Sequence, residues 1–135
     1  DLCLQKLKSL PANITVEYRG YAKRADVRDI LSRYDLFFLP TFAENFGHSI
    51  VESLLAGTPV LISDRTPWRN IDKEGLGWDL SLDDPKQFAE KIHSAALLTG
   101  SQKSEQRKAI MDASQRKFSD PSFADQTKSL FKTTT

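Results

Sequence analysis

Two short apolar runs, at 36–39 and 60–62, enclose a polar loop and an amphipathic segment, and this order constrains the fold more than any other feature. A helix is predicted to begin near His48 or Ser49 and to end before Gly57, because glycine and proline stop signals follow. Its apolar face consists of Ile50, Val51, Leu54 and Leu55. A strand, a helix and a second strand in succession predict a right-handed crossover in a parallel sheet. The loop and the helix start then lie at the carboxyl edge of the first strand, where such sheets bind ligands.

The start of this helix is a candidate anion site. Its first backbone N–H groups have no partner inside the helix and their dipoles add, which favours a phosphate. Gly47 has no Cβ and lets a ligand approach the backbone closely. Two carboxylates flank this point, Glu44 in the loop and Glu52 in the first turns of the helix. Because a carboxylate accepts hydrogen bonds from vicinal hydroxyls, a diphosphate with sugars at both ends satisfies the whole set, which predicts a nucleotide-sugar ligand.

The stretch Glu44-Asn-Phe-Gly-His-Ser-Ile-Val-Glu52, followed by Ala56-Gly-Thr-Pro-Val60, resembles a known signature. It is similar to the Glu-x7-Glu motif and the trailing Gly-x-Pro-Val of the group 1 retaining glycosyltransferases, family four in the usual classification. The resemblance implies a two-domain GT-B architecture with the motif in the C-terminal, donor-binding domain. It implies that Glu44 is the catalytic residue facing the donor sugar and that Glu52 holds the ribose hydroxyls. The residues implied to line the sugar and the diphosphate are Phe46, Gly47, His48 and Ser49.

Structural roles stay open for the same residues. Ser49 and Glu52 have the spacing of a capping box, in which a serine and a glutamate satisfy donors at a helix start. Glu44 alone is equally typical of a solvated loop carboxylate. His48 is either a surface residue of the first turn or a donor to a phosphate.

The composition bounds the class of protein. A chain of 135 residues has the size of one domain and buries a core without disulfide support. A net charge of +1 lacks the electrostatic footprint of a nucleic-acid-binding protein. The single cysteine, Cys3, excludes an internal disulfide and a multi-cysteine metal site, and it fits a reducing compartment. Because neither a membrane-spanning apolar run nor a signal peptide is evident, a cytoplasmic location is expected, which includes the inner face of the membrane.

The N-terminal part predicts a helix and a strand. The helix is expected at 1–10, with Leu2, Leu7 and Leu10 available for one packing face. The strand is expected at 14–20, where Ile14, Val16 and Tyr18 alternate with polar residues. The loop that follows this strand is expected at the same edge as the helix-start site. By the family resemblance, Gly20 and Tyr21 are neighbours of the nucleotide.

Between and beyond the central strands, further local signals appear. Asp26 is a good N-cap for a helix at 27–33. A second short helix is expected with Pro67 near its first turn. The next residue, Trp68, departs from the Gly-rich pattern of many relatives, and its role is open between core packing and a stacking platform for a sugar. Turn signals and apolar residues at 75–82 predict a short edge strand.

The C-terminal part predicts helices. The first begins at Asp84-Pro85 and is stopped by Gly100, and its expected buried face consists of Phe88, Ala89, Ile92, Ala95, Ala96 and Leu97. A charged helix is expected at 101–117. A last amphipathic helix after Pro121 contains Phe123, Leu130 and Phe131. By the resemblance, this helix packs on another domain, and its apolar face is otherwise a candidate surface for self-association.

The predicted fold is α/β, a Rossmann-like parallel sheet of about four strands flanked by helices. By the resemblance, residues 1–135 form the donor-binding half of a glycosyltransferase, without its N-terminal acceptor domain and the first elements of the donor domain. The chain alone is therefore expected to be inactive.

The expected reaction is a retaining transfer from a nucleotide sugar to a saccharide or lipid-linked acceptor, in polysaccharide biosynthesis. No metal or other cofactor is expected. Two alternatives stay open, a non-catalytic nucleotide-binding or assembly module and a GT-B nucleotide-sugar epimerase that abstracts a proton with a carboxylate.

Overall fold

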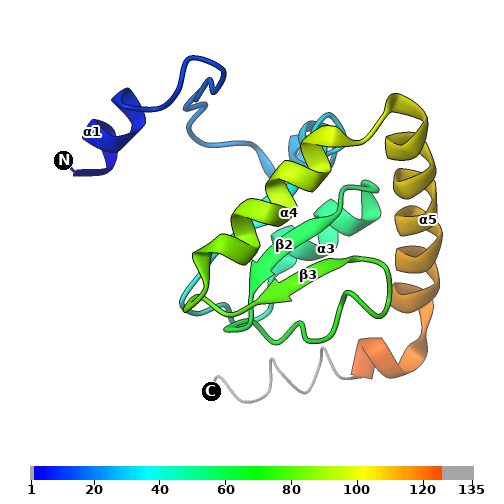
Figure 1. The fold of residues 1–135 in the computed structure, drawn as a ribbon. Coiled ribbons are helices and arrows are strands. Elements are labelled where there is room, and N and C mark those ends of the chain that lie inside the picture. Colours follow the sequence, from blue (N-terminus) through cyan, green and yellow to red (C-terminus); the bar gives the residue numbers. More distant parts are fainter. Residues whose placement is uncertain (1, 126–135) are drawn as a thin grey trace.

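The sheet consists of three parallel strands in the order β1-β2-β3 in the computed structural model, which describes residues 2–125 (Figure 1). The strands are β1 (Phe37–Leu39), β2 (Val60–Ser63) and β3 (Gly77–Leu80). The helices are α1 (Leu2–Lys8), α2 (Val27–Leu31), α3 (His48–Leu55), α4 (Pro85–Leu97) and α5 (Gly100–Ser119), with a 3-10 turn, η1, at Arg24–Asp26. The parallel α/β fold expected from the sequence is confirmed.

Two helices lie on opposite faces of the sheet. In Figure 1, α4 lies on the near side of the sheet, and α3 lies behind it. α5 stands to one side and contacts α3. The crossover from β1 through α3 to β2 is the one that the apolar runs predict. It places the loop before α3 at the carboxyl end of β1.

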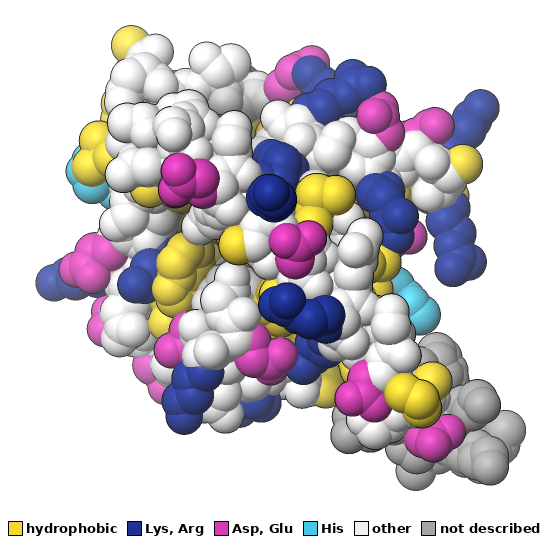
Figure 2. Space-filling view, turned by 90° about the vertical axis from the view of Figure 1, so that its right-hand side faces the viewer, with side chains coloured by type: hydrophobic (Ala, Val, Ile, Leu, Met, Phe, Trp, Pro, Cys, Tyr) yellow, Lys and Arg dark blue, Asp and Glu magenta, His cyan; other side chains and the backbone are white. Residues whose placement is uncertain are grey.

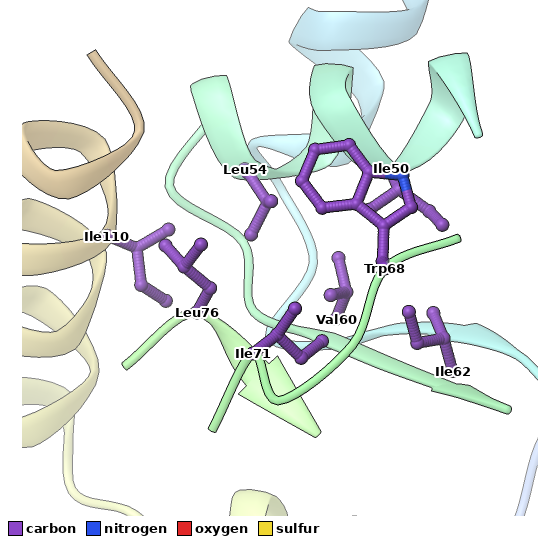
Figure 3. Close-up of a cluster of buried hydrophobic side chains, with 8 residues drawn as sticks. All are labelled: Ile50, Leu54, Val60, Ile62, Trp68, Ile71, Leu76 and Ile110. Carbon is purple, nitrogen blue, oxygen red and sulfur yellow. The ribbon is translucent and has the colours of Figure 1, made fainter. Parts of the chain in front are cut away.

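The main core lies between the sheet, α3 and α5 (Figure 3). All four residues of the central strand β2 are buried, as expected for a strand with neighbours on both sides. The buried cluster consists of Ile50, Leu54, Val60, Ile62, Trp68, Ile71, Leu76 and Ile110. Each large side chain of this kind contributes about 1.5–3 kcal/mol when it is removed from water. The core thus fixes α3 on the sheet.

Arg107 of α5 joins the ends of α2 and α3. Its Nη1 atom donates to the carbonyl of Ala56 at 3.0 Å and to Oγ1 of Thr58 at 3.1 Å, and its Nη2 atom donates to the carbonyl of Tyr34 at 2.8 Å. Thr58 in turn donates to the carbonyl of Leu31 at 2.7 Å. Carbonyl groups at helix ends lack partners inside the helix, so one guanidinium satisfies acceptors from two helices.

The variant Arg107→Met is expected to lower the free energy of unfolding by about 2 kcal/mol, because it leaves these carbonyl groups without their charged donor. Methionine keeps the apolar stem of the side chain. Urea unfolding followed by circular dichroism measures the change. Arg116→Met, at an exposed position of the same helix, is the control. Equal urea midpoints for the two variants would show that the hydrogen bonds of Arg107 do not stabilise the fold.

The strand expected at 14–20 is absent. Residues 14–20 are irregular, and Ile14, Val16 and Tyr18 are 49%, 52% and 94% exposed. No strand in the described part of the chain pairs with this segment. Alternating apolar and polar residues are typical of a strand, but a strand also needs a neighbouring strand to pair with. Because residues 14–20 have none, the sheet has three strands instead of about four.

The expected packing of α1 is also absent. The helix covers Leu2–Lys8, within the expected 1–10, but Leu2, Leu7 and Leu10 are all exposed. Figure 1 shows α1 apart from the sheet. An apolar face is buried only where another element covers it.

Two expected helix starts differ in detail. Asp26 makes no side-chain cap, because η1 precedes α2 and gives Asp26 near-helical backbone angles. No helix forms at Pro67. Residues 64–76 form a turn-rich loop whose amides at Asn70 and Ile71 donate to the carboxylate of Asp79, each at 3.1 Å. These tertiary hydrogen bonds replace those of a helix.

The predictions for α4 and α5 need correction at their junction. α4 begins at Pro85, as expected, but it ends at Leu97, and Gly100 opens α5 instead of stopping α4. Thr99 and Gln102 form a capping box, which satisfies the first amides of α5. Of the expected buried face of α4, only Phe88 is buried, whereas Ile92 and Leu97 are 41% and 68% exposed. The narrow sheet covers only one part of this helix.

The expected edge strand is β3, and the chain is helical again at 121–125, where Phe123 packs on Phe118. Leu130 and Phe131 lie outside the described residues, so the surface proposed for self-association is not described. Within residues 2–125, every helix is too short or too polar to span a membrane.

The face that carries α5 mixes charges of both signs. Figure 2 shows Lys and Arg side chains interspersed with Asp and Glu over this face. Such a surface lacks the single-sign field that attracts a polyanion. The mixture of charges on this face agrees with the net charge of +1.

Candidate functional site

A left-handed glycine opens α3. Gly47 is the N-cap residue of α3, with a φ of 79° and a ψ of 53°. A Cβ atom at this position would lie 2.7 Å from Cδ1 of Ile50 and 3.1 Å from Nε1 of Trp68. Glycine is therefore required both by the backbone angle and by the space. The helix starts at His48, within the predicted range.

The first turn of α3 presents its positive end at the carboxyl edge of β1. The amides of Ile50 and Val51 both donate to the carbonyl of Gly47, at 2.9 Å and 3.2 Å. The amides of His48 and Ser49 come earlier in the chain than these two donors. As first residues of the helix, they have no carbonyl one turn earlier in α3 to donate to. An anion is stabilised at such an end by the N–H groups and by the helix dipole.

Glu44 folds back on the loop. Its Oε1 atom accepts from the amide of Asn45 at 3.0 Å and from the amide of Gly47 at 3.3 Å. Its Oε2 atom makes no hydrogen bond within residues 2–125 and keeps its full acceptor capacity. Glu44 is half-buried. It is thus a structural element of the loop, in contrast to a solvated carboxylate, and one oxygen is left for a ligand hydroxyl.

Glu52 is not part of a capping box. The N-cap of α3 is Gly47, and no side chain forms a cap hydrogen bond there, so the pair of Ser49 and Glu52 does not perform the structural role that its spacing allows. Glu52 is half-buried, about one turn into α3. Its carboxylate has no hydrogen bond or ion pair within the described residues. Its place beside a ribose stays a prediction.

Two aromatic rings lie beside the glycine. Phe46 and His48 pack with ring centroids 4.6 Å apart and an interplanar angle of 56°. Phe46 is half-buried, whereas His48 is exposed. The imidazole thus stands at the open side of the loop, where it can donate to an anion.

The carboxyl ends of β1 and β2 are tied together. Ser63 donates through Oγ to the carbonyl of Thr41, and Oγ of Ser63 accepts from the amide of Arg65 at 3.3 Å. Thr41 donates through Oγ1 to the carbonyl of Ala43 at 2.7 Å. These hydrogen bonds hold the start of the loop that leads to α3 against the end of β2.

Sequence reasoning missed one contact of the site. Trp68 is only 7% exposed, and its Nε1 atom donates to the carbonyl of Phe46 at 2.7 Å. Its ring packs on Phe118 and Phe123 at centroid distances of 5.9 Å and 6.2 Å. Trp68 is thus a core residue and not an exposed platform for a sugar. The available signal is that a buried indole N–H needs an acceptor.

No hydrogen bond, ion pair or ring contact within residues 2–125 joins Gly20 or Tyr21 to this site. Tyr21 is 92% exposed, and a Cβ at Gly20 would have no atom within 4 Å. Their place beside a nucleotide stays a prediction. No group of three His, Cys, Asp or Glu residues within 2–125 has the arrangement of a metal site.

The parallel sheet carries a glycine-opened helix at the carboxyl end of β1, with Glu44 in the loop before it and Glu52 on the helix, in an α/β domain. The model of the family "Glycosyl transferases group 1" matches residues 2–116. The chain belongs to this family, and the resemblance carried by the Glu44–Glu52 motif is confirmed.

A curated relative is the mannosylfructose-phosphate synthase of Agrobacterium fabrum (strain C58 / ATCC 33970). It is 34% identical to this chain over 59 residues. The aligned part is 44% of this chain and 13% of the length of the synthase. The chain therefore corresponds to a small part of that enzyme.

Proposed function

We propose that this chain supplies the donor site of a retaining glycosyltransferase, which transfers a sugar from a nucleotide sugar to a saccharide or lipid-linked acceptor. The observation that carries the proposal is the start of α3, where Gly47 opens the helix in a left-handed conformation beside the Glu44 carboxylate. Family membership supports glycosyl transfer over an epimerase or a non-catalytic module.

The helix start is proposed to bind the diphosphate of the donor. The amides of His48 and Ser49 would donate to phosphate oxygens, and the helix dipole would stabilise the negative charge that grows as the diphosphate leaves. The exposed imidazole of His48 would supply a further donor. Preorganised donors of this kind lower the barrier because they need no reorientation during the reaction.

The two glutamates are proposed to bind hydroxyl groups. Oε2 of Glu44 would accept from the donor sugar, while Oε1 keeps its bonds to the loop amides. Glu52 would accept from the vicinal hydroxyls of the ribose. We assign Glu44 to orienting the sugar, because its carboxylate is already held by two amides. The acceptor oxygen would then attack the anomeric carbon on the face from which the diphosphate leaves.

The acceptor is proposed to bind outside this chain, on a second domain of a GT-B architecture. Membership of the group 1 glycosyltransferase family supports this part of the proposal. The interface between such domains would enclose the sugar at the carboxyl edge of the sheet.

The variant Glu52→Gln tests the site. It is expected to raise the Kd of the preferred nucleotide about tenfold or more, since a hydrogen bond to a charged group contributes about 1.5–3 kcal/mol. Isothermal titration calorimetry with UDP, GDP, ADP and their sugar conjugates measures the change.

Glu105→Gln is the matched control, because Glu105 is an exposed carboxylate of α5. It is expected to leave the affinity unchanged. An unchanged Kd for Glu52→Gln, in a protein whose unaltered form binds one of these nucleotides, would remove Glu52 from the site.

A further inference from the structure

One peptide group of the loop is held at both of its ends. The carbonyl of Phe46 accepts from Nε1 of Trp68 at 2.7 Å, and the N–H of the next residue, Gly47, donates to Oε1 of Glu44 at 3.3 Å. Both groups belong to the same planar peptide unit, in which the C=O and N–H bonds point in opposite directions. The indole and the carboxylate therefore fix one rotational setting of this peptide from opposite sides.

Glycine makes this fixation necessary. Gly47 tolerates positive and negative φ almost equally, so the peptide before it is free to rotate unless other groups restrain it. The left-handed φ of 79° is the conformation in which α3 begins at His48. Rotation of the peptide would turn the Gly47 N–H away from Glu44 and would disturb the helix start. Trp68 thus acts on both parts of the proposed donor site.

Trp68 is itself rigidly supported. Its ring meets Phe118 edge-on, with an interplanar angle of 79°, and Phe123 lies on the same cluster. The hydroxyl of Thr66 accepts from the backbone amide of Trp68 at 3.1 Å. Figure 3 shows the indole next to Ile50, between the loop after β2 and α3. A buried, packed ring with one N–H group is a precise donor because its rotamer is locked.

We propose that Trp68 is a positioning residue of the donor site. Its indole N–H fixes the Phe46–Gly47 peptide, and through this peptide it orients the Glu44 carboxylate and the first amides of α3. The inference rests on the proposed function, because it assigns the residue that sets the geometry of that same site. It also links the site to the C-terminal end of α5 through the aromatic cluster.

The first test compares Trp68→Phe with Ile110→Val. Both variants loosen the same core, but only the first removes the hydrogen bond to Phe46. Trp68→Phe is expected to raise the Kd of the nucleotide that the unaltered protein binds best, among UDP, GDP and ADP, about tenfold. Ile110→Val is expected to leave this Kd within about twofold. Both are measured at a temperature at which each variant is fully folded by circular dichroism.

The second test does not depend on a ligand. In the ligand-free protein, Trp68→Phe is expected to shift the Gly47 amide resonance in a ¹H–¹⁵N correlation spectrum, because that amide loses its fixed carboxylate partner. Ile110→Val is expected to leave this resonance in place. The double variant Trp68→Phe with Glu44→Gln is expected to have a Kd no higher than that of the single variant with the higher Kd. The reason is that both changes act through one peptide group.

Three results would contradict the inference: equal Kd values for Trp68→Phe and the unaltered protein, an unmoved Gly47 resonance, or additive effects in the double variant. Failure of the unaltered protein to bind any of the three nucleotides would instead overturn the proposed function, and with it the role of Trp68 in donor binding.

Discussion

Replacing Gly77 with alanine is expected to prevent the sheet from forming in its present register. Gly77 opens β3 with a φ of 147° and pairs with Val60 of the central strand. A Cβ atom there would lie 1.9 Å from the carbonyl oxygen of Val60 and 2.8 Å from its backbone nitrogen. Both are backbone atoms of a fully buried residue, so neither can move without separating β2 from β3. The expected loss of stability is about 4 kcal/mol or more, the range of severe core lesions.

Urea unfolding followed by far-ultraviolet circular dichroism measures this loss. Gly75→Ala is the matched control, because Gly75 also has a positive φ, of 70°, but a Cβ there would meet no atom within 4 Å. The control is expected to cost about 1–2 kcal/mol, the usual penalty of the left-handed conformation. If Gly77→Ala unfolded at the same urea concentration as Gly75→Ala, the close approach of β3 to Val60 would be wrong.

Gly47→Ala is expected to abolish nucleotide binding while the protein stays folded. The new Cβ would meet Cδ1 of Ile50 at 2.7 Å and Nε1 of Trp68 at 3.1 Å. Because both atoms belong to side chains, the fold can adapt, at a cost of about 1–3 kcal/mol for strain and overpacking. The adaptation, however, displaces the Phe46–Gly47 peptide and the first amides of α3. A displaced anion site loses most of its preorganisation, so the affinity is expected to fall about 100-fold or more.

Calorimetric titration and thermal unfolding of the same samples separate the two effects. Gly75→Ala again serves as the control, since it carries the same kind of backbone strain far from α3 in the sequence. Retention of full affinity in a folded Gly47→Ala protein would show that the ligand does not use the start of α3.

The central unit was predictable because its signals are local. The apolar runs at 36–39 and 60–62 are bounded by polar residues, and the glycines before and after α3 mark both of its ends. The structure places β1, α3 and β2 at these positions. Periodicity and glycine stop signals depend on a few neighbouring residues, so a sequence alone is sufficient to locate such elements.

The failures arise where the outcome depends on a distant partner. Residues 14–20 have the alternation of a strand, but alternation does not supply the neighbouring strand that completes it. α4 has a helical apolar pattern, yet only Phe88 is buried, because burial depends on how far the sheet extends beneath the helix. Pro67 is compatible with a helix start, but hydrogen bonds to Asp79 hold that loop in turns.

The candidate site likewise has features that local sequence predicts and features that depend on distant residues. The motif from Glu44 to Glu52 is contiguous, and the helix start within it was located from sequence. The bond from Trp68 to Phe46 joins residues 22 positions apart, and no local pattern indicates it. The two bonds from loop amides to one oxygen of Glu44 likewise depend on the three-dimensional course of the loop.

The most direct test of the donor site is a titration of the ¹⁵N-labelled protein with UDP, GDP or ADP, followed by the backbone amide resonances. The proposed donor site requires that the largest saturable shifts occur at Gly47, His48 and Ser49, where the first turn of α3 would meet the diphosphate. Saturable shifts centred elsewhere, for example on the hollow lined by Arg69, Trp78 and Lys91, would contradict it and would place the nucleotide on the opposite edge strand, β3.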